Sequence, residues 1–224
     1  SRPWRGRTRA RAGVLQCGPR FFRTEMNTLM LATLIAFAFY ALRAREQGQR
    51  IALLAQHLRR YQVEQLMERL TEGYQRVLGE SDLQRRDQLW QQFGASETAL
   101  AEQVGRLAQD FSRLDASQAR VSRLPLPFAA RWLPQACFDM RDLFALHAQG
   151  LTEVVRNSVQ RSPQERAYTL LAEMLLLQHS CHWFCRSRTV ASARLLARHQ
   201  TRHAQVLASV SAPTRAAYCQ LVGT

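Results

Sequence analysis

With 224 residues, of which 46% are hydrophobic, the chain is long enough for one packed domain of ordinary size. Its net charge is +14 and all 31 basic residues are arginine, but beyond residue 25 they are interleaved with acidic residues and glutamine, which argues against a nucleic-acid-binding stripe. The five cysteines are odd in number and irregularly spaced, which argues against a disulfide framework and fits reduced thiols in the cytoplasm.

The first 25 residues are strongly basic, with seven arginines and one acid, and show neither helical nor strand periodicity. Residue 1 is serine. We expect residues 1–25 to be a basic leader that is disordered or non-native, and Met26 to be the natural start of the protein.

Residues 26–42, MNTLMLATLIAFAFYAL, contain no charge and are followed at once by arginines. At about 1.5 Å per residue this length is at the short end of what crosses roughly 30 Å of hydrocarbon. Tyr40 suits the interface, and Arg43 can extend its guanidinium to the headgroups. We therefore predict a single membrane-spanning helix that contacts the lipid bilayer. Two alternatives stay open: a signal peptide cleaved near Ala36-Phe37-Ala38, and a buried helix of a soluble core.

Orientation depends on whether residues 1–25 are native. If they are not, positive charge follows the span and none precedes it, which predicts a cytoplasmic C-terminal domain on a single-pass protein of the inner (cytoplasmic) membrane. The arginines that follow the span most closely are Arg43, Arg45, Arg50, Arg59 and Arg60. If residues 1–25 are native, both flanks are basic and the rule decides little.

A helix is predicted to continue from the span to Val77, because apolar residues recur at steps of three and four from Ile51 onwards. Gly79 is expected to end this helix, and Ser81 or Asp82 to cap the next one.

The next helix is predicted over about 82–117, and its apolar stripe from Leu100 to Leu114 follows heptad spacing. Residues 43–120 are therefore expected to form a long helical hairpin. Coiled-coil pairing is the alternative, with a protein partner or a second copy bound through the helices of residues 43–117.

Residues 121–135, VSRLPLPFAARWLPQ, contain three prolines and are predicted to break the helices. Pro125 and Pro127 favour an extended segment. The segment is too apolar for a free linker, so we expect this connector to pack on the core; contact with the membrane surface or with a partner is the alternative.

Residues 136–224 are predicted to form a C-terminal helical bundle. Its helices are expected at about 135–160, 163–186, 188–210 and 213–222. Helix 163–186 is apolar nearly all round and is expected at the centre. Glu173 within it is expected to be buried, with an arginine or histidine of a neighbouring helix as its partner, and His147 is expected in the core or at an interface. No strand alternation appears, so the predicted fold class is all-α: an N-terminal transmembrane helix followed by an antiparallel bundle of about five helices.

The stretch QHSCHWFC, residues 178–185, contains the one cluster that resembles a metal site. On a helix, two thiols and an imidazole would share one face, which is a partial ligand set for zinc. One of two histidines four residues apart, or Cys219, could complete that set. The candidate ligands are Cys181, His182, Cys185, His199 and His203. The competing interpretation is that these side chains simply pack in the core.

No residue is assigned a catalytic role, because no cysteine has an identifiable base and orienting group. A phosphate-binding glycine loop and a nucleophile elbow are both missing from the sequence. We therefore expect a membrane-anchored, non-catalytic helical interaction or scaffold protein without a cofactor. The alternatives are a metal- or small-ligand-binding bundle that uses residues 178–185, and an arginine-driven binder of anionic lipid or nucleic acid.

Overall fold

The computed structural model describes residues 20–126 and 128–223, apart from the side chains of residues 20–26 and 131. Most of the described residues are helical, which confirms the predicted all-α fold class. The chain divides into two compact units, of which one ends at Ala41 and the other begins at Leu42.

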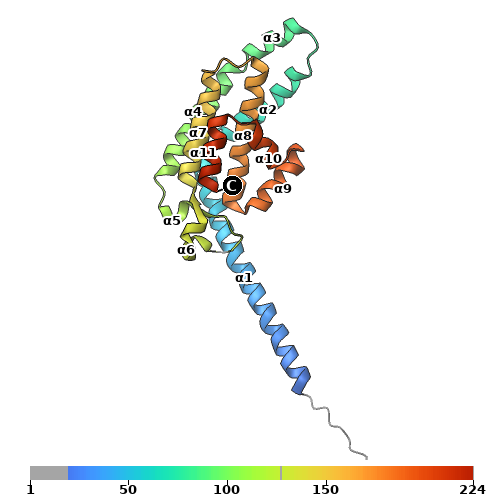
Figure 1. Cartoon of the computed structure of the whole chain (residues 1–224), viewed down its shortest axis with the longest axis vertical. Coiled ribbons are helices and arrows are strands. Elements are labelled where there is room, and N and C mark those ends of the chain that lie inside the picture. The colour runs from blue at the N-terminus through green and yellow to red at the C-terminus, as the bar shows by residue number, and fades with distance from the viewer. Residues whose placement is uncertain (1–19, 127, 224) are drawn as a thin grey trace, which may run out of the picture. The chain divides into compact units, whose positions relative to one another are not determined.

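Helix α1 (Arg20–Leu58) contains the predicted span (Figure 1). Its part from Asn27 to Leu58 is long and apolar enough to cross a membrane. Every side chain from Asn27 to Leu42 is exposed. None of this stretch is buried among the described residues.

The predicted boundary at residue 26 is wrong for the backbone, because α1 begins at Arg20. No glycine or proline occurs between residues 20 and 47, so nothing in the local sequence ends the helix earlier. Residues 20–25 of the predicted leader are therefore helical, and residues 1–19 lie outside the described residues.

The second unit, residues 42–223, is a helical bundle. Its helices after α1 are α2 (Val63–Leu78), α3 (Leu83–Gln91), α4 (Gly94–Ser112), α5 (Ala116–Ala119), α6 (Ala129–Trp132), α7 (Met140–Arg156), α8 (Pro163–Cys185), α9 (Arg188–His199), α10 (His203–Ser209) and α11 (Ala212–Val222). A 3-10 turn, η1 (Pro134–Ala136), and two short strands, β1 (Arg120–Ser122) and β2 (Cys137–Asp139), complete it.

Helix α8 is the centre of this bundle, as its sequence predicts. It packs against α7 on one side and against α9 and α10 on the other, and α2 also touches it. Ser162 and Glu165 form a capping box at its start, with Pro163 in the first turn. Most of its side chains are buried, because an apolar surface all round the helix needs neighbours all round.

The apolar stripe of α4 is buried inside the chain. Leu100, Val104, Leu107 and Phe111 are completely inaccessible to solvent, and α4 packs on α7 and on α2. The predicted pairing of the two segments is therefore present as α2 against α4, while the closest neighbour of α4 is α7, which the hairpin prediction did not include. The heptad spacing is used for packing within the chain.

Two helices that were predicted as continuous are broken. The first stops at Leu58 and restarts at Val63, where the Tyr61 hydroxyl donates to Asp110 Oδ2 at 2.7 Å and the Gln62 amide donates to Gln103 Oε1 at 2.6 Å. Both acceptors lie on α4, so tertiary contacts fix this turn.

The second break separates α3 from α4 around Phe93. The Phe93 ring packs edge-on against Tyr74, with ring centroids 5.2 Å apart, and against Trp90 at 6.2 Å. This aromatic cluster holds Phe93 between the two helices, and Gly94 begins α4. A helix of 82–117 without a break was therefore a wrong prediction.

The absence of strands was also predicted wrongly. Strands β1 and β2 pair antiparallel, with Val121 opposite Phe138 and Ser122 opposite Cys137. With three residues each they are too short to show alternation in the sequence. They close the ends of the Pro-rich connector, which therefore forms a loop fastened at its base.

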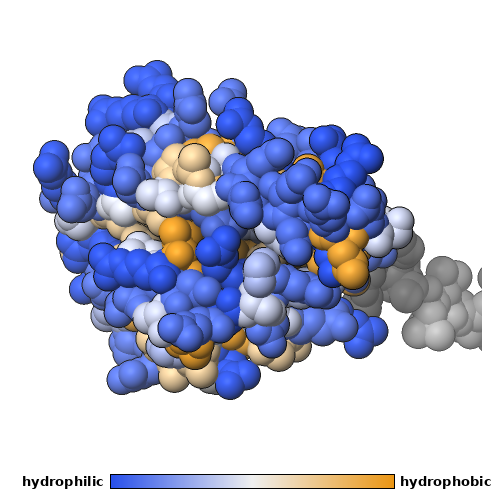
Figure 2. All heavy atoms as spheres, turned by 90° about the horizontal axis from the view of Figure 1, so that it is seen from above, coloured by the Kyte–Doolittle hydropathy of each residue, from blue (hydrophilic) through white to orange (hydrophobic). Residues whose placement is uncertain are grey.

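The C-terminal half differs in its helix boundaries. Helix α7 begins at Met140, after η1 and β2, and ends at Arg156, which is followed by Asn157 in the left-handed region. The predicted helix 188–210 is divided into α9 and α10, because Gln200 adopts a left-handed conformation, with φ 52°. Figure 2 shows that one face of the molecule is largely hydrophilic, with hydrophobic side chains only in small patches.

Candidate functional site

The exposed apolar stretch of α1, residues 27–42, is the feature that bears most directly on function. Leu29, Phe37 and Tyr40 are 70%, 68% and 70% exposed. Transfer of one such large apolar side chain out of water is worth about 1.5–3 kcal/mol, and a stretch of them in water is strongly unfavourable. The described part of the chain covers none of it. This surface is complementary to hydrocarbon.

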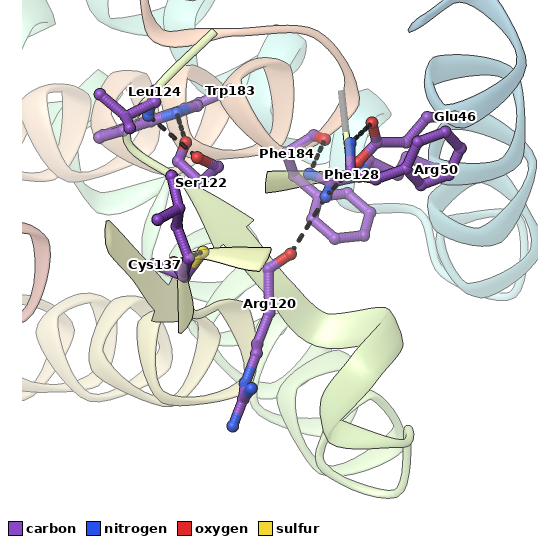
Figure 3. Close-up of polar contacts among 10 residues, drawn as sticks. Glu46, Arg50, Arg120, Ser122, Leu124, Phe128, Cys137, Trp183 and Phe184 are labelled. Atoms are coloured by element: carbon purple, nitrogen blue, oxygen red, sulfur yellow. Dashed lines mark hydrogen bonds and ion pairs between the residues drawn. The ribbon is translucent and has the colours of Figure 1, made fainter. Parts of the chain in front are cut away.

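Directly after this stretch, α1 is fastened to the Pro-rich connector; we call residues 43–50 with the segments that they contact the junction. The Phe128 amide donates to Glu46 Oε2 at 2.8 Å, and Arg50 forms an ion pair with Glu46 Oε1 at 2.8 Å (Figure 3). Arg43 donates to the Pro125 carbonyl at 3.4 Å. A carboxylate on α1 thus holds the backbone of a loop 82 residues further along the chain.

Arg50 links three elements at the junction. Its guanidinium donates to the carbonyl of Phe184 in α8 at 3.3 Å and to the carbonyl of Arg120 in β1 at 3.2 Å (Figure 3). It also lies over the Phe184 ring, 5.6 Å from the centroid. The last carbonyls of a helix have no partner within it, so an arginine at this place satisfies one end of α8.

A small cavity of about 60 Å³ opens at the junction and is lined mainly by positive charge. Its charged lining residues are Arg43, Glu46, Arg50, Arg123, Arg186 and Arg188. Arg123 is engaged, because it donates to the Val222 carbonyl at 2.7 Å and to the Leu221 carbonyl at 3.1 Å. Arg186 and Arg188 are exposed. The junction therefore presents net positive charge beside the apolar stretch.

The five predicted metal ligands do not form one cluster. Cys181 and Cys185 pack, half-buried, against the core. His182 Nδ1 lies 3.2 Å from Arg194 Nη1, and His199 Nε2 lies 3.0 Å from Gln178 Oε1. Among the residues that the structure describes, no three histidine, cysteine or acidic side chains lie together as a possible metal site.

His203, the fifth predicted ligand, meets a histidine outside the predicted set. Its ring stacks on that of His179 with centroids 4.2 Å apart, and its Nε2 lies 3.4 Å from the Tyr218 hydroxyl. His179 Nε2 in turn lies 3.1 Å from Ser192 Oγ. The sequence offsets placed the thiols and His182 on one helix face, but α9 and α10 approach α8 on the face of His179.

The buried titratable groups here are held neutral. Burial raises the pKa of the Cys181 thiol well above its usual range and also raises the pKa of Cys185. Burial lowers the pKa of His179 to about 3 and, for the predicted core residue His147, also to about 3. These thiols are therefore poor nucleophiles, and the imidazoles lack charge near neutral pH.

Between α8 and α9 lies a partly open cavity of about 470 Å³. Gln178, His182 and His199 contribute polar atoms to it, and Arg194 and Arg198 supply positive charge from successive turns of α9. His179 of α8 and apolar side chains of α9 form the rest of its wall. The arrangement suits a small ligand that carries negative charge.

Glu173 is fully buried, as predicted, but its predicted arginine or histidine partner is wrong. Its Oε1 accepts a hydrogen bond from the Ser211 amide at 3.1 Å, at the start of α11. The unpaired amides at a helix start attract a carboxylate, which explains this partner. Burial raises the pKa of Glu173.

A second buried carboxylate, Glu97, is not marked by the sequence pattern. Its Oε1 accepts from the Tyr74 hydroxyl at 2.7 Å, and its Oε2 forms an ion pair with Arg166 at 3.1 Å. Its place in the first turn of α4 resembles an ordinary exposed helix start.

Comparison of the chain with protein-family models, with curated proteins and with solved structures found no match.

Proposed function

We propose that the protein is a single-pass membrane protein whose helical unit, residues 42–223, is a non-catalytic binding or scaffold domain at the membrane surface. The observation that carries this proposal is the fully exposed apolar stretch of α1, residues 27–42, which only a non-aqueous environment satisfies. The high pKa of the Cys181 thiol argues against that thiol as a covalent nucleophile.

We propose that the helical unit faces the cytoplasm, at the inner membrane, on the condition that residues 1–25 are not native. Arg43 and Arg45 follow the apolar stretch at once, which supports this orientation under the positive-inside rule. The four described cysteines are free thiols, which agrees with a reducing compartment. A protein partner of this domain, bound through the helices of residues 43–117, is part of the same proposal.

Membrane fractionation of the full chain tests the anchor. We expect the protein to stay with membranes through washes in high salt and at alkaline pH, and to be released by detergent. The variant Leu34→Arg/Phe37→Arg, which places two charges in the apolar stretch, should be recovered in the soluble fraction or be degraded. A wild-type protein that is soluble overturns the proposal. So does a soluble product cleaved near Ala38, which would identify a signal peptide.

Protease protection tests the orientation. An epitope inserted into the exposed turn between α2 and α3, around Ser81, should resist protease in intact cells and be cleaved after permeabilisation. Cleavage in intact cells would place the helical unit on the outer side.

A second candidate function, binding of a small anionic ligand, is favoured by the cavity between α8 and α9. Inorganic phosphate and citrate serve as probes in a thermal-shift assay. Binding at this cavity should raise the melting temperature of the wild type, and Arg194→Gln/Arg198→Gln should abolish the rise, whereas the same change at Arg85 and Arg86 on α3 should not. An equal rise in both variants would reject the cavity as the site.

A further inference from the structure

We propose that the loop from Leu124 to Trp132 is a second membrane contact, which inserts into the interfacial layer of the bilayer that residues 27–42 span. The inference rests on the proposed anchoring and adds the surface of the helical unit that touches lipid. Its partner is an anionic lipid surface.

The first observation is the apolar character of the loop. Leu124 and Leu126 are 43% and 48% exposed, and Trp132 is 74% exposed, more than Leu29 or Tyr40 of the apolar stretch. Three such side chains within nine residues are unusual on a surface that faces water. Tryptophan is also the side chain most at home at the boundary between headgroups and acyl chains.

The second observation is where the loop is attached. Its backbone is bound to α1 at Arg43 and Glu46, through the carbonyl of Pro125 and the amide of Phe128. Glu46 is four residues beyond Leu42, the last residue of the apolar stretch, which on a helix is a rise of about 6 Å. The headgroup layer on each side of the hydrocarbon is roughly 5–7 Å thick. The attachment therefore holds the loop at the depth of the headgroups.

The third observation is that hydrogen bonds fix the base of the loop. The paired strands β1 and β2 close its base, where the Arg123 amide donates to the Ala136 carbonyl at 2.9 Å. At the base of the loop, the Leu124 amide donates to Ser122 Oγ at 3.0 Å, and the Trp183 indole donates to the Ser122 carbonyl at 3.3 Å (Figure 3). Such a fastened loop keeps its apolar side chains outside the core, because its backbone cannot fold back over them.

The fourth observation is charge. Arg43 and Arg188 line the junction cavity together with Leu124 and Leu126, and Arg45 beside them is exposed. Apolar side chains edged by arginine match a layer in which acyl chains lie below anionic phosphates. A protein partner would satisfy the apolar part as well, but the hydrogen bonds that fasten the loop to α1 directly after the span favour lipid as its neighbour.

Quenching of tryptophan fluorescence tests the proposal. The full chain is reconstituted into vesicles of equal parts phosphatidylcholine and phosphatidylglycerol, with or without lipids brominated near the headgroup end of the acyl chain. We expect the quenchable emission to fall by about half or more in Trp132→Phe, because Trp132 lies at the interface. Trp90→Phe is the matched control: Trp90 is buried on α3, so its loss should leave the quenchable emission unchanged. Trp4 and Trp183 are common to all these proteins and cancel in the comparison.

The variant Leu126→Asp tests whether the loop inserts into the interface or only lies near it. A charged side chain at this position should disfavour insertion of the loop and lower the quenching of Trp132, while flotation with the vesicles stays as in the wild type. Circular dichroism confirms that each variant is folded.

Two failures are distinguishable. A wild-type chain that does not float with vesicles overturns the anchoring itself. A chain that floats, and whose quenching is the same with and without Trp132, overturns the loop contact alone. Equal quenching of Trp132 in vesicles of phosphatidylcholine only would refute the preference for anionic lipid.

Discussion

The Glu46 carboxylate accepts the amide of Phe128 across 82 residues of sequence, and at the same time pairs with Arg50 one turn further along α1. One acid thus orders a loop and positions the arginine that binds α8 and β1. Its side chain is 16% exposed, so water competes weakly for these contacts.

Glu46→Ala should therefore destabilise the helical unit by about 1–3 kcal/mol, the usual cost of leaving buried polar partners unsatisfied. Glu46→Gln retains an acceptor for the Phe128 amide and should lose less. Chemical denaturation of the detergent-solubilised chain measures both, and Glu64→Ala, at an exposed site on α2, is the control. Equal stability of Glu46→Ala and the wild type would show that the junction contacts contribute nothing.

Gly150 in α7 allows a close approach to the buried acid Glu173. A Cβ at this position would lie 2.8 Å from Glu173 Oε2 and 2.5 Å from Thr214 Oγ1, which is closer than real Cβ contacts. Gly150→Ala should therefore cost about 1–3 kcal/mol, in spite of the better helix propensity of alanine.

Gly105 in the interior of α4 provides the opposite control, because no atom lies within 4 Å of the Cβ that it lacks. Gly105→Ala should stabilise the protein by up to about 1 kcal/mol. Thermal unfolding of the two variants side by side checks the sign at each site. A stabilising Gly150→Ala would mean that the contact with Glu173 relaxes without cost.

His147 makes the stability of the bundle depend on pH. Burial lowers its pKa from 6.5 to about 3, so below pH 6.5 the unfolded chain binds a proton that the folded chain rejects. The free energy of unfolding is therefore highest above pH 6.5. It falls as the pH is lowered towards 3, by at most about 1.4 kcal/mol per pH unit for one histidine. Burial is also the main reason why the pKa of His179 is lowered, so His179 contributes to the loss of stability over the same pH range.

His147→Gln should remove one histidine's share of this slope while it keeps a donor and an acceptor for Ser180 Oγ, which lies 2.9 Å from His147 Nε2. Unfolding free energies at several pH values between 4 and 8 measure the slope. His57→Gln at the end of α1 is the comparison. An unchanged slope in His147→Gln would show that other groups cause the loss in acid.

The buried carboxylate of Glu97 accepts a hydrogen bond from the Tyr74 hydroxyl and pairs with the half-buried guanidinium of Arg166. Glu97→Ala leaves both without a partner and should cost about 3–5 kcal/mol. Arg166→Ala/Glu97→Leu, which removes both charges, should cost clearly less than Glu97→Ala, because no buried charge remains unpaired. A double-mutant comparison by denaturation tests this order, and additive losses would contradict it.

What the sequence predicted well depends on local chemistry. Helix α8 begins where Ser162 and Pro163 predicted, because a capping box satisfies its own amides within four residues. The apolar stretch of α1 needs only its composition to be recognised.

What it did not predict depends on distant partners. The break near Tyr61 is fixed by Asp110, and the break at Phe93 by Tyr74, and neither pair shares a local pattern. The partners of the histidines follow from how α9 and α10 approach α8. Offsets along a single helix cannot show that approach, which is why His179 and not a thiol meets His203.

Arg123 has a practical consequence for anyone who labels this protein. Because its guanidinium donates to the carbonyls of Leu221 and Val222 from the base of the apolar loop, the end of α11 lies beside that loop. A bulky fluorescent fusion at that end would crowd the surface that we assign to lipid, and could mimic a loss of membrane contact. The turn between α2 and α3, at the other end of the bundle from α6, is the safer place for a reporter (Figure 1).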